Sequence, residues 1–138
     1  MQKASYQQHM YNRAQVETAN TGRILLTLYD AAIRFVRLGS QQISNGDIAS
    51  KGVTLSRAYA IIAEFIHALD HDQAPELCDN LEQIYGWMLE QISEANLNMT
   101  NEPLTPVLTH LIDLRETWSE AVGKAALEKA TSAAAVSQ

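Results

Sequence analysis

The sequence predicts an all-α protein, an antiparallel four-helix bundle with a short N-terminal cap segment, and three observations support this prediction. The chain has 138 residues and 46% of them are hydrophobic, which fits one domain with a core of its own. Apolar residues recur at helical spacing over four stretches, whereas long alternating β-branched runs do not occur. Asn, Gly, Asp and Pro residues separate these stretches as turns.

Residues 1–20 are polar and carry isolated apolar anchors, among them Tyr6, Met10 and Tyr11. Their spacing is too irregular for a core helix, so we expect an arm or short helix that caps a groove of the bundle. The bundle itself is expected at residues 21–129, and residues 130–138 are expected to form a flexible tail.

The first two bundle helices are expected at residues 21–44 and at 47–69. Asn20 or Thr21 can cap the first, and Asp47 can cap the second after the turn that contains Gly46. At about 100° per residue, the buried face of the first helix comprises Leu25, Leu28, Tyr29, Ala32, Val36 and Ile43, and that of the second comprises Leu55, Ala58, Tyr59, Ile62, Ile66 and Leu69.

The third helix is expected from Pro75, which suits a first helical position, to about Asn96. The fourth is expected to start at residues 101–103 and to end near Lys129. Their buried faces comprise Leu77, Leu81, Tyr85, Met88 and Ile92, and Leu104, Val107, Leu111, Leu114, Trp118 and Val122. Four amphipathic helices joined by short turns pack most simply as an antiparallel bundle.

The charge pattern excludes several classes of partner. The formal net charge is −6, and Lys and Arg are scattered singly, so we expect no nucleic-acid binding and repulsion from anionic membranes. No stretch approaches the roughly 18 apolar residues that a membrane span needs, so no membrane insertion is expected. Residues 1–10 lack the apolar core of a secretory signal, and the single Cys78 suits a reducing compartment. We therefore expect a location in the cytoplasm.

The sequence offers one catalytic-looking pair, Glu64 and His67, which resembles half of a di-iron site in a helical bundle. His71 follows one turn later, but a second Glu-x-x-His is missing. Relative to Ile62, Glu64 and His67 point about 200° and 140° around the helix, towards solvent. Cys78 neighbours the apolar stripe and is expected to be a small core residue. The sequence therefore predicts no catalytic residue, metal, cofactor or small-molecule substrate.

Several apolar residues lie beside the predicted buried faces rather than on them: Leu26, Ile33, Ile61, Trp87, Leu89 and Ile112. They fit either a broad core face with a few exposed apolar residues or shallow grooves for an amphipathic helix of a partner. On the second interpretation, the predicted partner-binding residues are Tyr6, Met10, Tyr11, Leu26, Ile33, Ile61, Trp87 and Ile112.

Four segments in this order resemble the FliS family of flagellin-specific export chaperones: LYDAAIRF (28–35), AYAIIAEF (58–65), NLEQIYGWM (80–88) and LIDLRETW (111–118). The resemblance extends from Tyr6 to Trp118. It departs from the family pattern at Gly22, where a helix-starting proline is usual, at Ala31 in place of glycine, and at Trp87 in place of tyrosine.

The resemblance implies a non-catalytic cytoplasmic chaperone with the predicted four-helix fold and N-terminal cap. Such a chaperone binds the C-terminal region of flagellin, prevents its premature polymerisation and presents it to a component of the flagellar type III export gate. Two alternatives from other classes are a metal-binding helical bundle that uses Glu64 and His67, and a general helical adaptor with another client.

Overall fold

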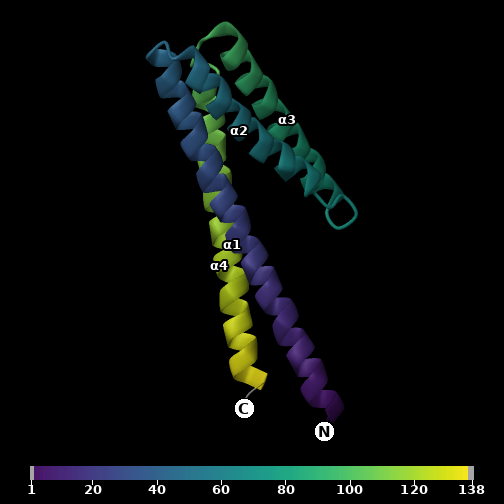
Figure 1. The fold of residues 1–138 in the computed structure, drawn as a ribbon. Helices are drawn as coiled ribbons and strands as arrows, with labels where there is room; N and C mark the ends of the chain where they lie inside the picture. Colours follow the sequence, from purple (N-terminus) through teal and green to yellow (C-terminus); the bar gives the residue numbers. More distant parts are fainter. Residues whose placement is uncertain (1, 137–138) are drawn as a thin grey trace. The chain divides into compact units, whose positions relative to one another are not determined.

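The computed structural model describes the backbone of residues 2–136 and the side chains of residues 21–128, 130–132 and 134. The chain forms four helices, α1 (Gln2–Ser44), α2 (Ile48–His67), α3 (Pro75–Asn98) and α4 (Leu104–Val136), which are labelled in Figure 1. Residues 2–136 contain no strand. The predicted all-α class with four bundle helices is confirmed. The side chains of the predicted cap lie outside the part that the structure describes.

Contacts divide the chain into two compact units. The first comprises Met1–Leu28 and Leu114–Gln138, and the second comprises Tyr29–Asp113. In the first unit, Gly22 of α1 lies against Val122 of α4, so that a Cβ at Gly22 would be 2.9 Å from Val122 Cγ2. Because α1 continues through this position, a proline would break a helical hydrogen bond here, whereas glycine permits the close approach.

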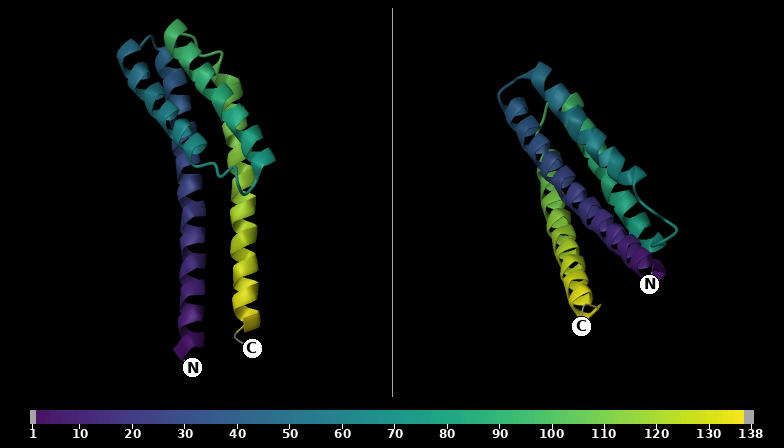
Figure 2. Two further views of the ribbon diagram at one scale, coloured as in Figure 1. Left: turned by 90° about the vertical axis from the view of Figure 1, so that its right-hand side faces the viewer. Right: turned by 60° about the horizontal axis from the view of Figure 1, so that its bottom comes forward.

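The second unit holds most of the buried core. Its helices α2 and α3 run side by side in opposite directions and form a helical hairpin (Figures 1 and 2). Phe65 stacks on Tyr29, with ring centroids 4.4 Å apart, and lies 5.5 Å from the ring of Tyr85. The hydroxyl groups of the two tyrosines hydrogen-bond to each other in the core. The largest fully buried side chains are Tyr29, Val36, Leu55, Ile62, Met88, Ile92, Leu104, Val107 and Leu111.

These nine residues all belong to the predicted buried faces. The prediction was wrong at Tyr59 and Leu77, whose side chains are 41% and 52% exposed. Cys78, the next residue of α3, is buried in place of Leu77. Phe65 of α2 is also buried, although the predicted face of that helix did not include it. Five smaller or nearly buried members of the predicted faces are buried as well: Ala32, Ile43, Ala58, Leu81 and Tyr85. The other members are only partly buried: Leu25, Leu28, Ile66, Leu69, Leu114, Trp118 and Val122.

The predicted turns set most of the helix ends. Asp47 caps α2, because its Oδ1 accepts a hydrogen bond from the Ser50 backbone N–H at 3.2 Å. Pro75 is the first residue of α3, as expected. Helix α3 ends at Asn98 and is capped by Met99, whose φ of 51° places it in the left-handed region.

The outer ends of α1 and α4 differ from the expectation. Helix α1 begins at Gln2, so residues 20 and 21 lie within it and do not cap it. Helix α4 continues to Val136, past the end expected near Lys129. These helix ends lack a regular row of apolar residues, so an analysis of apolar spacing does not detect them. Within residues 2–136, no helix has both the length and the apolarity needed to cross a bilayer.

Candidate functional site

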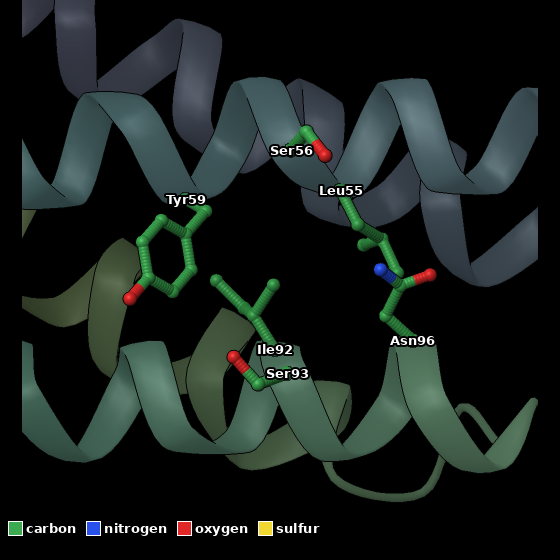
Figure 3. A pocket seen from close by; sticks show the side chains of 6 residues that line it. All are labelled: Leu55, Ser56, Tyr59, Ile92, Ser93 and Asn96. Atoms are coloured by element: carbon green, nitrogen blue, oxygen red, sulfur yellow. The ribbon is translucent and has the colours of Figure 1, made fainter.

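A shallow pocket lies between α2 and α3, with a volume of about 120 Å³. Figure 3 shows side chains of α2 directed towards α3 and side chains of α3 directed back towards α2. The lining residues are Leu55, Ser56, Tyr59, Ile92, Ser93 and Asn96. Sites for small-molecule ligands usually measure roughly 300–1,000 Å³, so this pocket suits a single inserted side chain better than a metabolite.

The pocket has an apolar floor and an amphipathic rim. Leu55 and Ile92 form the floor and are each 1% exposed, whereas the Tyr59 ring stands at the rim. A tyrosine at such a rim offers an apolar ring and a hydroxyl that stays in contact with water, a combination that is common at protein interfaces. On the helical projection Tyr59 lies only about 60° from Ile62, so the sequence analysis assigned it to the buried face of α2. It therefore did not predict that Tyr59 is a surface residue.

One end of the pocket is held by a buried lysine. Lys51 is 7% exposed, and its Nζ donates hydrogen bonds to the backbone oxygen of Asn96 at 2.5 Å and to Asn96 Oδ1 at 2.7 Å. The Asn96 carbonyl belongs to the last turn of α3, where carbonyl groups lack intrahelical partners and the helix dipole attracts cations. Lys51 therefore joins the first turns of α2 to the last turn of α3 and fixes one wall of the pocket.

Further large apolar side chains are exposed on the same hairpin. Helix α2 exposes Ile48 and Val53, and α3 exposes Leu77 and Leu97, the last of these at 85%. Ile48 and Leu97 lie at the hairpin end that Lys51 and Asn96 join. Exposed apolar side chains that share one end of a hairpin, as these two do, commonly mark surfaces that bind other proteins.

A second candidate surface follows one face of α1 within the second unit. It is formed by Asp30, Ile33, Arg34, Arg37, Leu38 and Gln41. The spacing of these residues places them along one side of the helix. Arg34 also lies 5.3 Å from the centre of the Phe35 ring, and Arg57 of α2 lies 5.9 Å from the same ring. This face combines apolar residues with two arginines and an aspartate, unlike the uncharged pocket between α2 and α3.

The predicted partner-binding residues are distributed over all four helices. Tyr6, Met10 and Tyr11 lie outside the described side chains, and Leu26 is half-buried in the first unit. The other four lie on four different helices of the second unit: Ile33, Ile61, Trp87 and Ile112. None of these four lines the pocket between α2 and α3. Their binding role stays a prediction.

The structure shows the surroundings of two of these residues, Ile33 and Trp87. Ile33 is 8% exposed on the α1 face and is therefore largely a core residue. Trp87 is half-buried and makes an edge-on ring contact with His110 of α4, with centroids 5.2 Å apart.

The residues that suggested metal chemistry are only partly grouped. Glu64 and His67 are exposed on α2, which agrees with their expected direction. Cys78 is buried and its Sγ lies 3.3 Å from the Asp70 carbonyl oxygen, which agrees with a small core residue. Among the described residues, His71 meets Asp79 and Glu82 of α3, a grouping that sequence spacing did not reveal.

Comparisons with known proteins agree on one family. A family model described as "Flagellar protein FliS" matches residues 1–125. The chain is 30% identical to the flagellar secretion chaperone FliS of Bacillus subtilis over 112 residues, which cover 81% of this chain and 83% of the relative. It is 28% identical to the flagellar secretion chaperone FliSB of Pseudomonas aeruginosa, over 76% of this chain and 83% of that protein. It is 27% identical to the flagellar secretion chaperone FliS of Salmonella typhimurium, over 83% of this chain and 85% of that protein.

Proposed function

The chain belongs to the FliS family of flagellar secretion chaperones, and from that premise we propose that it binds the C-terminal region of flagellin in the bacterial cytoplasm. In this role it prevents premature polymerisation of flagellin and aids its delivery to the flagellar type III export apparatus, where the loaded chaperone contacts a gate component. The activity is binding and release, without catalysis.

The observation that best supports this proposal is the pocket of the α2–α3 hairpin, which has an apolar floor and the Tyr59 ring at its rim. A chaperone for a segment that is disordered when free must supply apolar surface on which that segment becomes ordered as a helix. Ordering the segment costs free energy, so the net affinity stays moderate and the cargo can be released. A shallow pocket that accepts one side chain suits such recognition better than a deep cavity would.

The pocket also indicates which contact is expected to contribute most. An apolar side chain of the cargo that enters between Tyr59 and Ile92 reaches the buried floor and covers the exposed tyrosine ring. Full burial of one large apolar side chain stabilises a complex by roughly 1.5–3 kcal/mol. A few such anchors usually account for most of the affinity of an interface.

The proposal can be tested by calorimetric titration of the full chain with a C-terminal peptide of flagellin from the same organism. We expect about one peptide per chain, and we expect Tyr59→Asp to weaken binding at least about tenfold, because the charge is desolvated without a partner. Val53→Asp is the matched control, since Val53 is also an exposed apolar residue of α2 but does not line the pocket. Circular dichroism should show unchanged helicity in both variants.

The outcomes separate the function from the location of the groove. If the unaltered protein binds no flagellin peptide, the proposed function is wrong. If the peptide binds and both variants bind it like the unaltered protein, the pocket is not the groove. Trp87→Asp then tests the anchors proposed from the sequence, and it is a better probe than Ile33→Asp, because Ile33 is mostly buried and a charge there would destabilise the bundle.

A further inference from the structure

We propose that His71, Asp79 and Glu82 form a binding site for a divalent transition-metal ion, of which Zn²⁺ is the best match. His71 lies in the connection after α2, and the two carboxylates lie on α3. The ligand atoms that the three residues can offer all lie within 4.8 Å of one another. This group is separate from Glu64 and His67, and it takes no part in the pocket between α2 and α3.

The local structure holds His71 in place. The carbonyl oxygen of Asp70 accepts hydrogen bonds from Gln73 N at 3.2 Å and from Cys78 Sγ at 3.3 Å. The Asp70 side chain accepts another from Asp72 N at 3.1 Å. Since Cys78 is buried in α3, this network attaches the connection to the helix that carries the carboxylates. His71 is thus presented by an ordered turn.

The two carboxylates are brought together by helix geometry. Asp79 and Glu82 are three residues apart on α3, a spacing that places side chains next to each other on one side of a helix. His71 Nδ1 lies 3.2 Å from Asp79 Oδ1, and His71 Nε2 lies 3.4 Å from Glu82 Oε2. The imidazole therefore sits between two acidic groups that helix geometry keeps close.

The three ligand atoms, all within 4.8 Å of one another, must come slightly closer together to share one metal ion. Zinc binds nitrogen and carboxylate oxygen at about 2.0–2.2 Å, so neighbouring ligand atoms of a tetrahedral site are roughly 3.3–3.5 Å apart. One ion can use only one nitrogen of the ring, so the side chains must rotate slightly to converge on it. They have room to do so, because the side chains of His71, Asp79 and Glu82 are 41%, 67% and 51% exposed. Water can occupy the remaining coordination position.

The donor set selects the class of ion. Calcium and magnesium prefer sites built wholly from oxygen, whereas an imidazole nitrogen favours zinc and related transition metals. The neighbouring Asp70 and Asp72 add negative charge around the site, which attracts a cation. A bound ion would link the α2–α3 connection to the first turns of α3 and so stabilise this end of the hairpin.

The test uses the full chain without an affinity tag, freed of metal with a chelator and titrated calorimetrically with zinc chloride. We expect saturable binding of one ion per chain and a rise of the melting temperature on saturation. Loss of a residue that only orients a metal ligand weakens binding about 10–100-fold, so His71→Ala and Asp79→Asn should each weaken it at least tenfold. His67→Ala is the matched control, because His67 is also exposed but is not one of the three ligands.

Three results would overturn the proposal: no saturable zinc binding, equal binding by the unaltered protein and His71→Ala, or a loss of binding in His67→Ala. Calcium that binds as tightly as zinc would refute the assigned class of ion. Circular dichroism of each variant shows whether it is folded, and folded variants are expected since all three positions are on the surface. None of these results depends on whether flagellin binds.

Discussion

Replacing Gly39 or Gly86 by alanine should change the stability of the bundle in opposite directions. Both glycines lie inside helices, Gly39 in α1 and Gly86 in α3, where alanine is the better helix former by up to about 1 kcal/mol. A Cβ at Gly86 would meet nothing within 4 Å. Gly86→Ala should therefore raise the free energy of unfolding by about 0.5–1 kcal/mol.

Gly39 has no such space. A Cβ there would lie 2.5 Å from Leu55 Cδ2 and 3.0 Å from Leu55 Cγ. Leu55 is only 1% exposed, so its side chain must shift within a packed core. Overpacking of this kind costs about 1–3 kcal/mol of stability. Over most of this range the cost is larger than the gain from the better helix propensity of alanine. We expect Gly39→Ala to be less stable than Gly86→Ala by about 1–3 kcal/mol.

Urea denaturation followed by circular dichroism measures this difference as a shift of the midpoint at an unchanged slope. Gly52→Ala is a further control, since a Cβ at Gly52, which is in α2, would also meet nothing within 4 Å. If Gly39→Ala stabilises the protein as much as Gly86→Ala does, Leu55 can move without cost. The reasoning that glycine is required for the close approach of α1 and α2 would then be refuted.

Three further predictions concern the core, the lysine contact and the N-terminal segment. Phe65→Ala should lower the free energy of unfolding by about 3–5 kcal/mol, measured by the same denaturation, because it removes the ring that lies between two buried tyrosines. Lys51→Met should cost about 1–3 kcal/mol and speed amide hydrogen exchange in the last turn of α3, because Asn96 loses a charged donor; unchanged exchange there would contradict this. Residues 1–20, if they form a cap that cargo displaces, should show low protection from exchange that changes when flagellin peptide binds, and protection equal to that of the core helices in both states would contradict this.

The sequence predicted the fold well because each helix carries its own evidence. Apolar spacing identified four helices, and local chemistry identified Asp47 and Pro75 at helix starts. Such signals depend on residues within one or two turns of each other, so they can be recognised without knowledge of the tertiary structure. The start of α1 was not predicted, because residues 2–20 lack a regular apolar face.

The candidate sites were harder to predict, since they depend on which helices are neighbours. A helical projection gives the direction of Tyr59 around α2, but it cannot show that α3 leaves this ring at the rim of a pocket. For the same reason it placed Leu77 in the core, where Cys78 lies instead. The grouping of His71 with Asp79 depends on the path of the connection between α2 and α3, which no periodic pattern encodes.

The division of the chain into two compact units has a consequence for spectroscopy. The chain contains two tryptophans, and Trp87 lies in the unit Tyr29–Asp113 whereas Trp118 lies in the other. Each unit therefore carries one tryptophan, whose fluorescence can be excited separately from that of the tyrosines. Fluorescence of a Trp118→Phe variant reports on the hairpin and its core, and fluorescence of a Trp87→Phe variant reports on the segments that include both chain ends. With these two variants, the order in which the units lose structure on heating can be followed without any attached label.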